Sequence, residues 1–193
     1  MKILVVDDTN VNLEAAKQTI PGQHELTLAS SYDEAYRLLE KPKDGGPPPF
    51  DVVLTDLLMP AGSIQQGGEG KKYVGQEMPV GFALALMAVL QGAKLVAVVT
   101  DLDHHKHPAA AMLDRLGSDG LDGRESDFVK IHANGVPMGF VNYAPKVGVE
   151  TVDCEVCGGV GTMPETAKCC WCYKGKMPGK NWGRVLQSLL KWG

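Results

Sequence analysis

The stretch DVVLTDLLMP, residues 51–60, decides the fold of this 193-residue chain. Its first part, Asp51–Thr55, is a short run of apolar and β-branched residues. Such a run is typical of a strand that is buried on both faces of a parallel sheet. Asp56 follows the run directly, and Met59-Pro60 comes three residues later. The stretch therefore predicts a central strand whose carboxyl end carries an acidic side chain.

Similar runs lie on both sides of this stretch. Strand patterns occupy Lys2–Val6, Glu25–Ala29 and Leu95–Val99, and helical patterns separate them over Val11–Ile20, Tyr32–Glu40 and Pro79–Leu90. A fifth strand is expected from a hairpin formed by Phe128–Ile131 and Met138–Tyr143. Strands that alternate with helices predict right-handed βαβ units. We therefore expect an α/β fold with a five-stranded, doubly wound parallel sheet of the flavodoxin-like type.

Acidic and hydroxyl side chains end three of these strands. Asp7 and Asp8 follow the first strand, Asp56 the third and Thr100 the fourth. In open α/β sheets the ligand site lies at the carboxyl ends of the strands, so these side chains are expected at one rim. Converging carboxylates favour a bound divalent cation, and oxygen ligands favour Mg²⁺ or Mn²⁺. An aspartate beside such a cation can act as a nucleophile and form an acyl phosphate.

The runs KILVVDD (residues 2–8), DVVLTDLLMP (51–60) and LVAVVT (95–100) resemble the response-regulator receiver domain of two-component signalling. The resemblance covers roughly Met1–Thr100. It implies that Asp7, Asp8 and Asp56 hold Mg²⁺, and that Asp56 accepts a phosphoryl group from a histidine-kinase-type donor. It also implies that Thr100 couples phosphorylation to a change at the protein surface. The chain would then be a phosphoprotein that signals through protein contacts, and not a turnover enzyme.

The sequence departs from the receiver pattern at three places. The loop after Met59-Pro60 is longer than in the family, and Asp101 stands where a small residue is usual. The family's Lys-Pro after the fifth strand is missing, which leaves Lys130 and Lys146 as candidates for the lysine of the site. Lys146 is favoured because it follows the last strand. A receiver-shaped scaffold that takes no phosphate is the alternative to the phosphoacceptor hypothesis.

All five cysteines lie in one short stretch. Two C-x-x-C pairs, Cys154/Cys157 and Cys169/Cys172, have the spacing of a tetrahedral structural zinc site, and Cys170 is the spare. The first pair, with its following glycines, also resembles the C-x-x-C-x-G-x-G repeat of J-domain co-chaperones. Redox-active or disulfide-bonded thiols are the alternative. Lys168, Lys174, Lys176 and Lys180 make this stretch locally basic, which predicts a solvated surface.

A polar stretch, Asp101–His107, follows the fourth strand and contains two aspartates and three histidines. It resembles the D-x-D motif of haloacid-dehalogenase-type phosphotransferases, with Asp101 as nucleophile and Asp103 as acid/base. A metal-dependent phosphatase is therefore a further hypothesis. A solvated loop that leads into a helix at Pro108 is the simpler interpretation.

Composition limits the remaining function classes. The net charge of −4 disfavours general binding to nucleic acid, and no apolar run is long enough for a membrane span. Only four apolar residues stand between Met1-Lys2 and Asp7, which is too short for a signal-peptide core, so the sequence predicts a cytoplasmic protein. We expect a receiver-like domain over 1–150, an inserted zinc module over 151–178 and a terminal helix over 179–193 that packs back on the domain. A non-phosphorylated adaptor with a protein partner remains an alternative.

Overall fold

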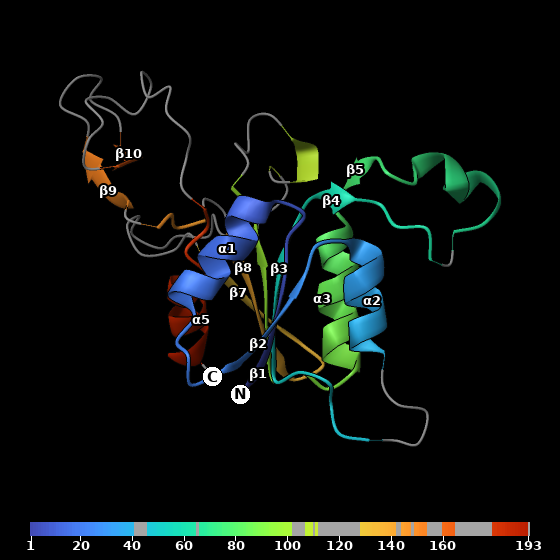
Figure 1. Cartoon of the computed structure of the whole chain (residues 1–193), viewed down its shortest axis with the longest axis horizontal. Helices are drawn as coiled ribbons and strands as arrows, with labels where there is room; N and C mark the ends of the chain where they lie inside the picture. Colours follow the sequence, from blue (N-terminus) through green and yellow to red (C-terminus); the bar gives the residue numbers. More distant parts are fainter. Residues whose placement is uncertain are drawn as a thin grey trace.

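The structure is a computed structural model, and it describes residues 1–40, 46–64, 66–101, 107–109, 111, 128–141, 144–147, 149–153, 160–164 and 179–192. Its centre is a six-stranded sheet in the order β2-β1-β3-β6-β8-β7 (Figure 1). These strands are β1 (Lys2–Val6), β2 (Glu25–Ala29), β3 (Val52–Asp56), β6 (Leu95–Val99), β7 (Phe128–Ala133) and β8 (Val136–Val141). The first five strands in this order are parallel to their neighbours, which is compatible with the flavodoxin-like arrangement.

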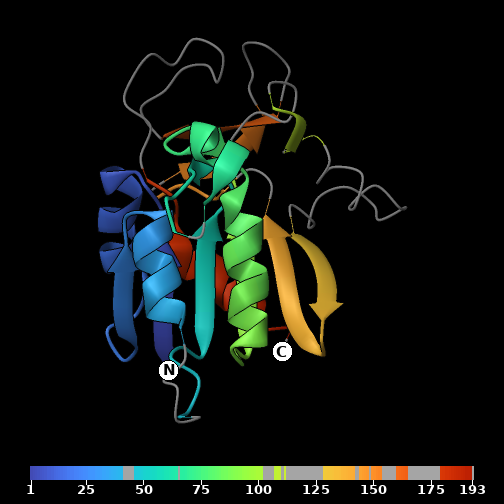
Figure 2. The same ribbon diagram turned by 90° about the vertical axis from the view of Figure 1, so that its right-hand side faces the viewer.

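The expected five-stranded, all-parallel sheet is wrong in its strand count. Both arms of the predicted hairpin join the sheet: β8 pairs parallel with β6, and β7 pairs antiparallel with β8 at the edge (Figure 2). The turn between them is Asn134-Gly135, and both residues have positive φ, 50° and 77°. This conformation matches the twist of a two-residue hairpin, so the chain folds straight back and adds a sixth strand.

Two helical layers cover the sheet. Helices α1 (Asn10–Thr19) and α5 (Trp182–Leu190) lie on one face, and α2 (Tyr32–Leu39) and α3 (Val80–Leu90) lie on the other (Figure 1). Alternate residues of each central strand therefore enter different cores. In β1, Ile3 and Val5 pack towards α1 and α5, whereas Leu4 and Val6 pack towards α2 and α3. Because both faces are buried, the strand sequence is a continuous apolar run and not an alternating one.

An ordered arm separates β3 from α3. It contains the short antiparallel strands β4 (Met59–Pro60) and β5 (Glu77–Met78) and the 3₁₀ helix η1 (Gly68–Tyr73). Asp33, in the first turn of α2, accepts hydrogen bonds from Ser63 N (3.0 Å), Ser63 Oγ (2.7 Å) and Ile64 N (3.2 Å). The long loop expected from the sequence is thus tied to α2, and its last residues return to the carboxyl end of the sheet.

The C-terminal part of the chain returns to the sheet at Lys180. Lys146 and Lys180 form an isolated antiparallel bridge, and α5 then packs against α1 and β6. Between these points, β9 (Val149–Asp153) and β10 (Val160–Pro164) form a separate two-stranded antiparallel sheet. The five cysteines lie outside the described residues, so the zinc site stays a prediction. Within the described part of the chain, no helix combines the length and apolar character needed to cross a bilayer.

Candidate functional site

Three carboxylates meet at the carboxyl ends of β1 and β3. One oxygen each from Asp7, Asp8 and Asp56 lies within 4.8 Å of the others. Asp7 and Asp56 are buried, at 0% and 8% exposure, while Asp8 is exposed. The structure therefore brings together the three side chains that the sequence predicts as cation ligands, two of them directly after β1 and one at the end of β3. Parallel pairing of β1 with β3 is the reason, because it brings both carboxyl ends to one edge.

A fully buried lysine completes this cluster. Lys180 Nζ lies 2.7 Å from Asp7 Oδ2, 2.8 Å from Asp56 Oδ1 and 3.8 Å from Asp101 Oδ1. The basic stretch that contains Lys180 predicts a solvated surface, and for Lys180 that prediction is wrong, since its exposure is 0%. The sequence around Lys180 is Gly-Lys-Asn-Trp-Gly, at the start of the terminal helix, and nothing in it indicates a carboxylate partner.

The lysines favoured by the sequence analysis lie elsewhere. Lys146 Nζ contacts Asp101 Oδ2 at 2.6 Å, at the outer side of the cluster. Lys130 Nζ lies 5.6 Å from the centre of the Trp192 ring. Lys146 comes five residues after β8 ends, and its bridge partner Lys180 occupies the inner position beside Asp56. The lysine that contacts Asp56 in the structure is therefore Lys180, while the favoured candidate Lys146 contacts Asp101.

Burial and charge oppose each other in this cluster. Burial raises the pKa of Asp56 to about 7, helped by Asp7 and opposed by Lys180. Burial and the neighbouring Asp7 also raise the pKa of Asp8. For Lys180, burial favours the neutral amine, but Asp56, Asp7 and Asp101 outweigh it and hold its pKa above the ordinary value. The Lys180 ammonium is thus the shared counter-ion of several carboxylates. A divalent cation would reduce the repulsion that remains between these carboxylates.

Hydrogen bonds fix the two buried carboxylates. Asp7 Oδ1 accepts from Thr9 N at 2.9 Å and from Asn12 Nδ2 at 3.0 Å. Asp56 Oδ1 accepts from Leu57 N at 2.8 Å, in addition to its contact with Lys180. Because backbone and buried donors hold both groups, little reorganisation is needed when a ligand binds.

Thr100 follows β6 directly, next to the strand position that pairs with Asp56. Asp56 pairs with Val99, and Thr100 is one residue further and 1% exposed. Its backbone N–H donates to Val141 O at 2.9 Å, and its carbonyl accepts from Ala144 N at 2.9 Å. Thr100 therefore lies at the same rim as the carboxylates, where β6 meets the segment that follows β8.

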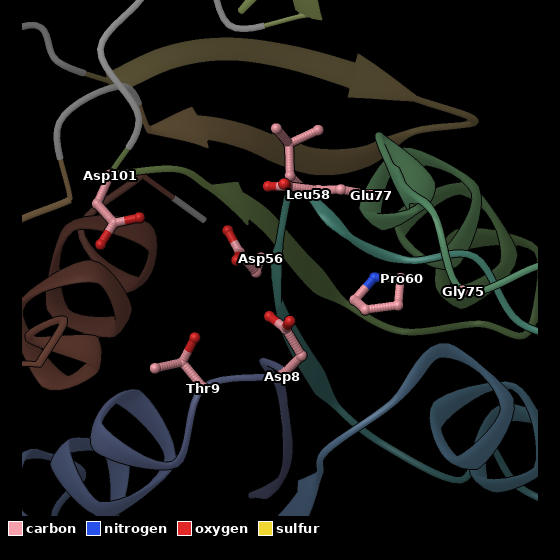
Figure 3. Close-up of a pocket in the computed structure, with 8 residues that line it drawn as sticks. All are labelled: Asp8, Thr9, Asp56, Leu58, Pro60, Gly75, Glu77 and Asp101. Atoms are coloured by element: carbon pink, nitrogen blue, oxygen red, sulfur yellow. The ribbon is translucent and has the colours of Figure 1, made fainter.

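A pocket of about 250 Å³ opens over the cluster (Figure 3). Its lining residues are Asp8, Thr9, Asp56, Leu58, Pro60, Gly75, Glu77 and Asp101. Four of them, Leu58, Pro60, Gly75 and Glu77, belong to the arm between β3 and α3. One water needs only about 10–15 Å³ of this kind of volume, so the pocket has room for several small polar groups.

The structure describes one of the two aspartates on which the phosphatase hypothesis depends. Asp101 lines the pocket and pairs with Lys146, whereas Asp103 lies outside the described residues, as do His104 and His105. Burial acts to raise the pKa of Asp101, whereas Lys180 and then Lys146 act to lower it. The net result is a pKa below the ordinary value for an aspartate. Asp101 is therefore held as an ionised partner of lysine at the pocket wall.

Comparisons with known proteins give one structural likeness. No protein-family model matches the chain, and no curated protein matches it. Among solved structures, the chain is similar to one chain of a crystal structure of the P1 domain of CheA3 in complex with CheY6 from R. sphaeroides. The sequence identity is 16%, the TM-score is 0.38, and the match covers 98% of this chain and 96% of that chain. The residues of the site, and not this likeness, are therefore the basis for assigning a function.

Proposed function

We propose that this chain is a receiver-like signalling protein that accepts a phosphoryl group on Asp56. The observation that carries the proposal is the buried ion pair of Lys180 with Asp56, 2.8 Å apart, beside the carboxylates of Asp7 and Asp8. Asp7, Asp8 and Asp56 are the residues that would hold Mg²⁺. A histidine-kinase-type protein is the proposed phosphodonor, and the signal would pass through protein contacts.

The proposed reaction is a phosphoryl transfer to a carboxylate. An oxygen of Asp56 forms a bond to phosphorus while the bond from phosphorus to the donor breaks, and the electron pair leaves with the donor. The leaving group is acetate for acetyl phosphate, or an imidazole that takes up a proton for phosphohistidine. Mg²⁺, when bound, neutralises charge on the transferred group. Lys180 adds a second positive charge next to Asp56, and Thr100 is the proposed hydroxyl donor to a phosphoryl oxygen.

The charge balance of the site explains why a cation would be required. Its described acidic groups are Asp7, Asp8, Asp56, Glu77 and Asp101, and its described ammonium groups are Lys146 and Lys180. With every group ionised, five negative charges face two positive charges. A phosphodonor is itself an anion, so it approaches this pocket against repulsion unless a divalent cation is bound.

The proposal predicts that acetyl phosphate and Mg²⁺ together add one phosphoryl group to the protein. Intact-protein mass spectrometry should detect it, and the group should be labile, as an acyl phosphate is. Asp56→Asn should abolish the modification, because the amide is not a nucleophile of this kind. Asp51→Asn is the matched control, since Asp51 lies at the opposite end of β3 and pairs with Lys94. A wild-type protein that takes up no phosphate under these conditions would contradict the proposal.

We further propose one structural zinc held by Cys154, Cys157, Cys169 and Cys172. Four thiolates leave no open position, so this ion would stabilise the 151–178 stretch and take no part in the transfer. Elemental analysis of protein purified without chelator should give one zinc per chain. Cys157→Ser should lower that ratio strongly, while Cys170→Ser, the matched control, should leave it unchanged. Equal loss in both variants, or no zinc in the wild type, would exclude this ligand set.

A further inference from the structure

Lys180 reaches the site from a segment that docks beside the sheet. Val147 N donates to Gly179 O at 3.0 Å, and Asn181 N donates to Pro145 O. These bonds and the Lys146–Lys180 bridge hold one side of the segment Gly179–Gly183. The other side lies against α1, which begins just after Asp7 and Asp8. The position of the Lys180 ammonium therefore depends on how this segment is held to α1.

Asn12 joins the segment to the acidic cluster. Its side chain is buried, with the residue 6% exposed. Its Oδ1 accepts from Lys180 N at 3.0 Å, and its Nδ2 lies 3.0 Å from both carboxylate oxygens of Asp7. The Asn12 amide thus contacts both the backbone of Lys180 and the Asp7 carboxylate, and the Lys180 ammonium pairs with this same carboxylate. A carboxamide can do this because it carries an acceptor and a donor on one planar group.

Close packing around Asn12 reinforces this contact. The backbone carbonyl of Asn12 accepts from Trp182 Nε1 at 3.0 Å, and Trp182 is fully buried. A Cβ on Gly179 would lie 2.5 Å from Val11 O, and a Cβ on Gly183 would lie 2.1 Å from Thr19 O. Glycine at both positions is therefore needed for the segment to approach α1 so closely.

We infer that Asn12 is a positioning residue that places the Lys180 ammonium between Asp7 and Asp56. A lysine side chain has four flexible carbon–carbon bonds, and holding it in one buried arrangement costs conformational entropy. Asn12 reduces the freedom that remains by fixing both the lysine backbone and the Asp7 carboxylate. The inference concerns how the site is assembled. It does not depend on phosphoryl transfer, so it can fail or hold independently of the proposed function.

Amine labelling tests this inference without a phosphodonor. Folded wild-type protein should protect Lys180 from an acylating reagent, while Lys94, whose side chain is 75% exposed, reacts as the internal standard. In Asn12→Ala and Asn12→Leu, the labelling rate of Lys180 relative to Lys94 should rise by about tenfold or more, because local opening exposes the amine. Leucine keeps the volume of the side chain and serves if alanine prevents folding.

A second asparagine in the same segment provides the control. Asn181 caps α5 by accepting from Arg184 N at 3.0 Å, and its side chain makes no hydrogen bond to Asp7 or Lys180 in the described part of the chain. Asn181→Ala should weaken the helix end but leave Lys180 as protected as in the wild type.

The ammonium signal of Lys180 in ¹⁵N-lysine NMR gives a readout that loss of overall stability would not move. It should be observable in the wild type and in Asn181→Ala, and absent from both Asn12 variants. Folded Asn12 variants that keep the protection and the ammonium signal would overturn the inference. So would an Asn181→Ala protein that loses them to the same extent.

Discussion

Lys180→Met should destabilise the protein by about 3–5 kcal/mol at neutral pH and should prevent phosphoryl transfer to Asp56. Methionine has a similar length and fits the buried position, so the main loss is the charge. Asp7 and Asp56 would then be buried close together without a counter-ion, and removing one partner of a buried ion pair is far costlier than losing an exposed one. Urea unfolding followed by tryptophan fluorescence measures the loss.

The matched control for this change is Lys146→Met. The Lys146 side chain is 10% exposed, and its partner Asp101 is 35% exposed and lies 3.8 Å from Lys180. After the substitution, water and Lys180 can therefore still stabilise the Asp101 carboxylate. The expected loss is about 1 kcal/mol or less. The cost of Lys180→Met should also shrink as the pH is lowered or as Mg²⁺ is added, because a proton or a cation then neutralises the carboxylates. Equal costs for the two lysines would show that Lys180 is not the main counter-ion of the cluster.

Without divalent cations, the stability of the wild-type protein should decrease as the pH rises from about 5 to about 8. The pKa of Asp56 is raised to about 7 in the folded protein. In the unfolded chain an aspartate ionises near pH 4, so the folded form binds the extra proton between these values. This contribution is fully present below the unfolded pKa and is lost as the pH rises through 7. Its upper limit is about 4 kcal/mol over the whole interval from pH 4 to pH 7, at about 1.4 kcal/mol for each pKa unit, and about 3 kcal/mol of this falls above pH 5.

Asp56→Asn should remove most of this pH dependence and stabilise the cation-free protein at pH 8. The amide oxygen can still accept from Lys180, and the buried negative charge is gone. Asp8, whose pKa is also raised, should leave a smaller dependence of the same sign. Asp51 and Asp101 have lowered pKa values, so the stability that they contribute is lost only as the pH falls through those values, below this window.

Mg²⁺ should reverse the trend in the wild type, with the largest rise in unfolding midpoint at high pH, where the carboxylates are ionised. Thermal unfolding across pH, with Mg²⁺ or with chelator, separates these effects. The same Mg²⁺ stabilisation in Asp56→Asn as in the wild type would exclude Asp56 as a ligand. A cation-free stability that increases from pH 5 to pH 8 would contradict the raised pKa.

The sequence was sufficient to predict the central strands and the acidic rim. Apolar runs such as Lys2–Val6 report burial on both faces, and parallel pairing then determines which strand ends meet. Asp7, Asp8 and Asp56 are close because each follows or ends such a run. The sixth strand was missed because Asn134-Gly135 specifies a hairpin but does not specify how many of its arms join the sheet.

Lys180 could not be assigned from local patterns. It is 173 residues away from Asp7, and its placement depends on contacts of Gly179, Asn12 and Trp182 that no periodicity encodes. The arm before α3 presents the same difficulty. Its glycine-rich sequence has no period, and its order depends on Asp33, thirty residues before Ser63. Both features rest on long-range polar contacts of single side chains.

The bridge between Lys146 and Lys180 also makes the stretch between them modular. The chain departs at Val147 and rejoins at Gly179 through two hydrogen-bonded neighbours, so the junction has the geometry of a hairpin base. The entropy of closing a chain on such a base grows only slowly with its length. Segments of very different size and chemistry can therefore be exchanged at this junction over evolutionary time, or by protein engineering, while the lysine stays beside its acidic partners.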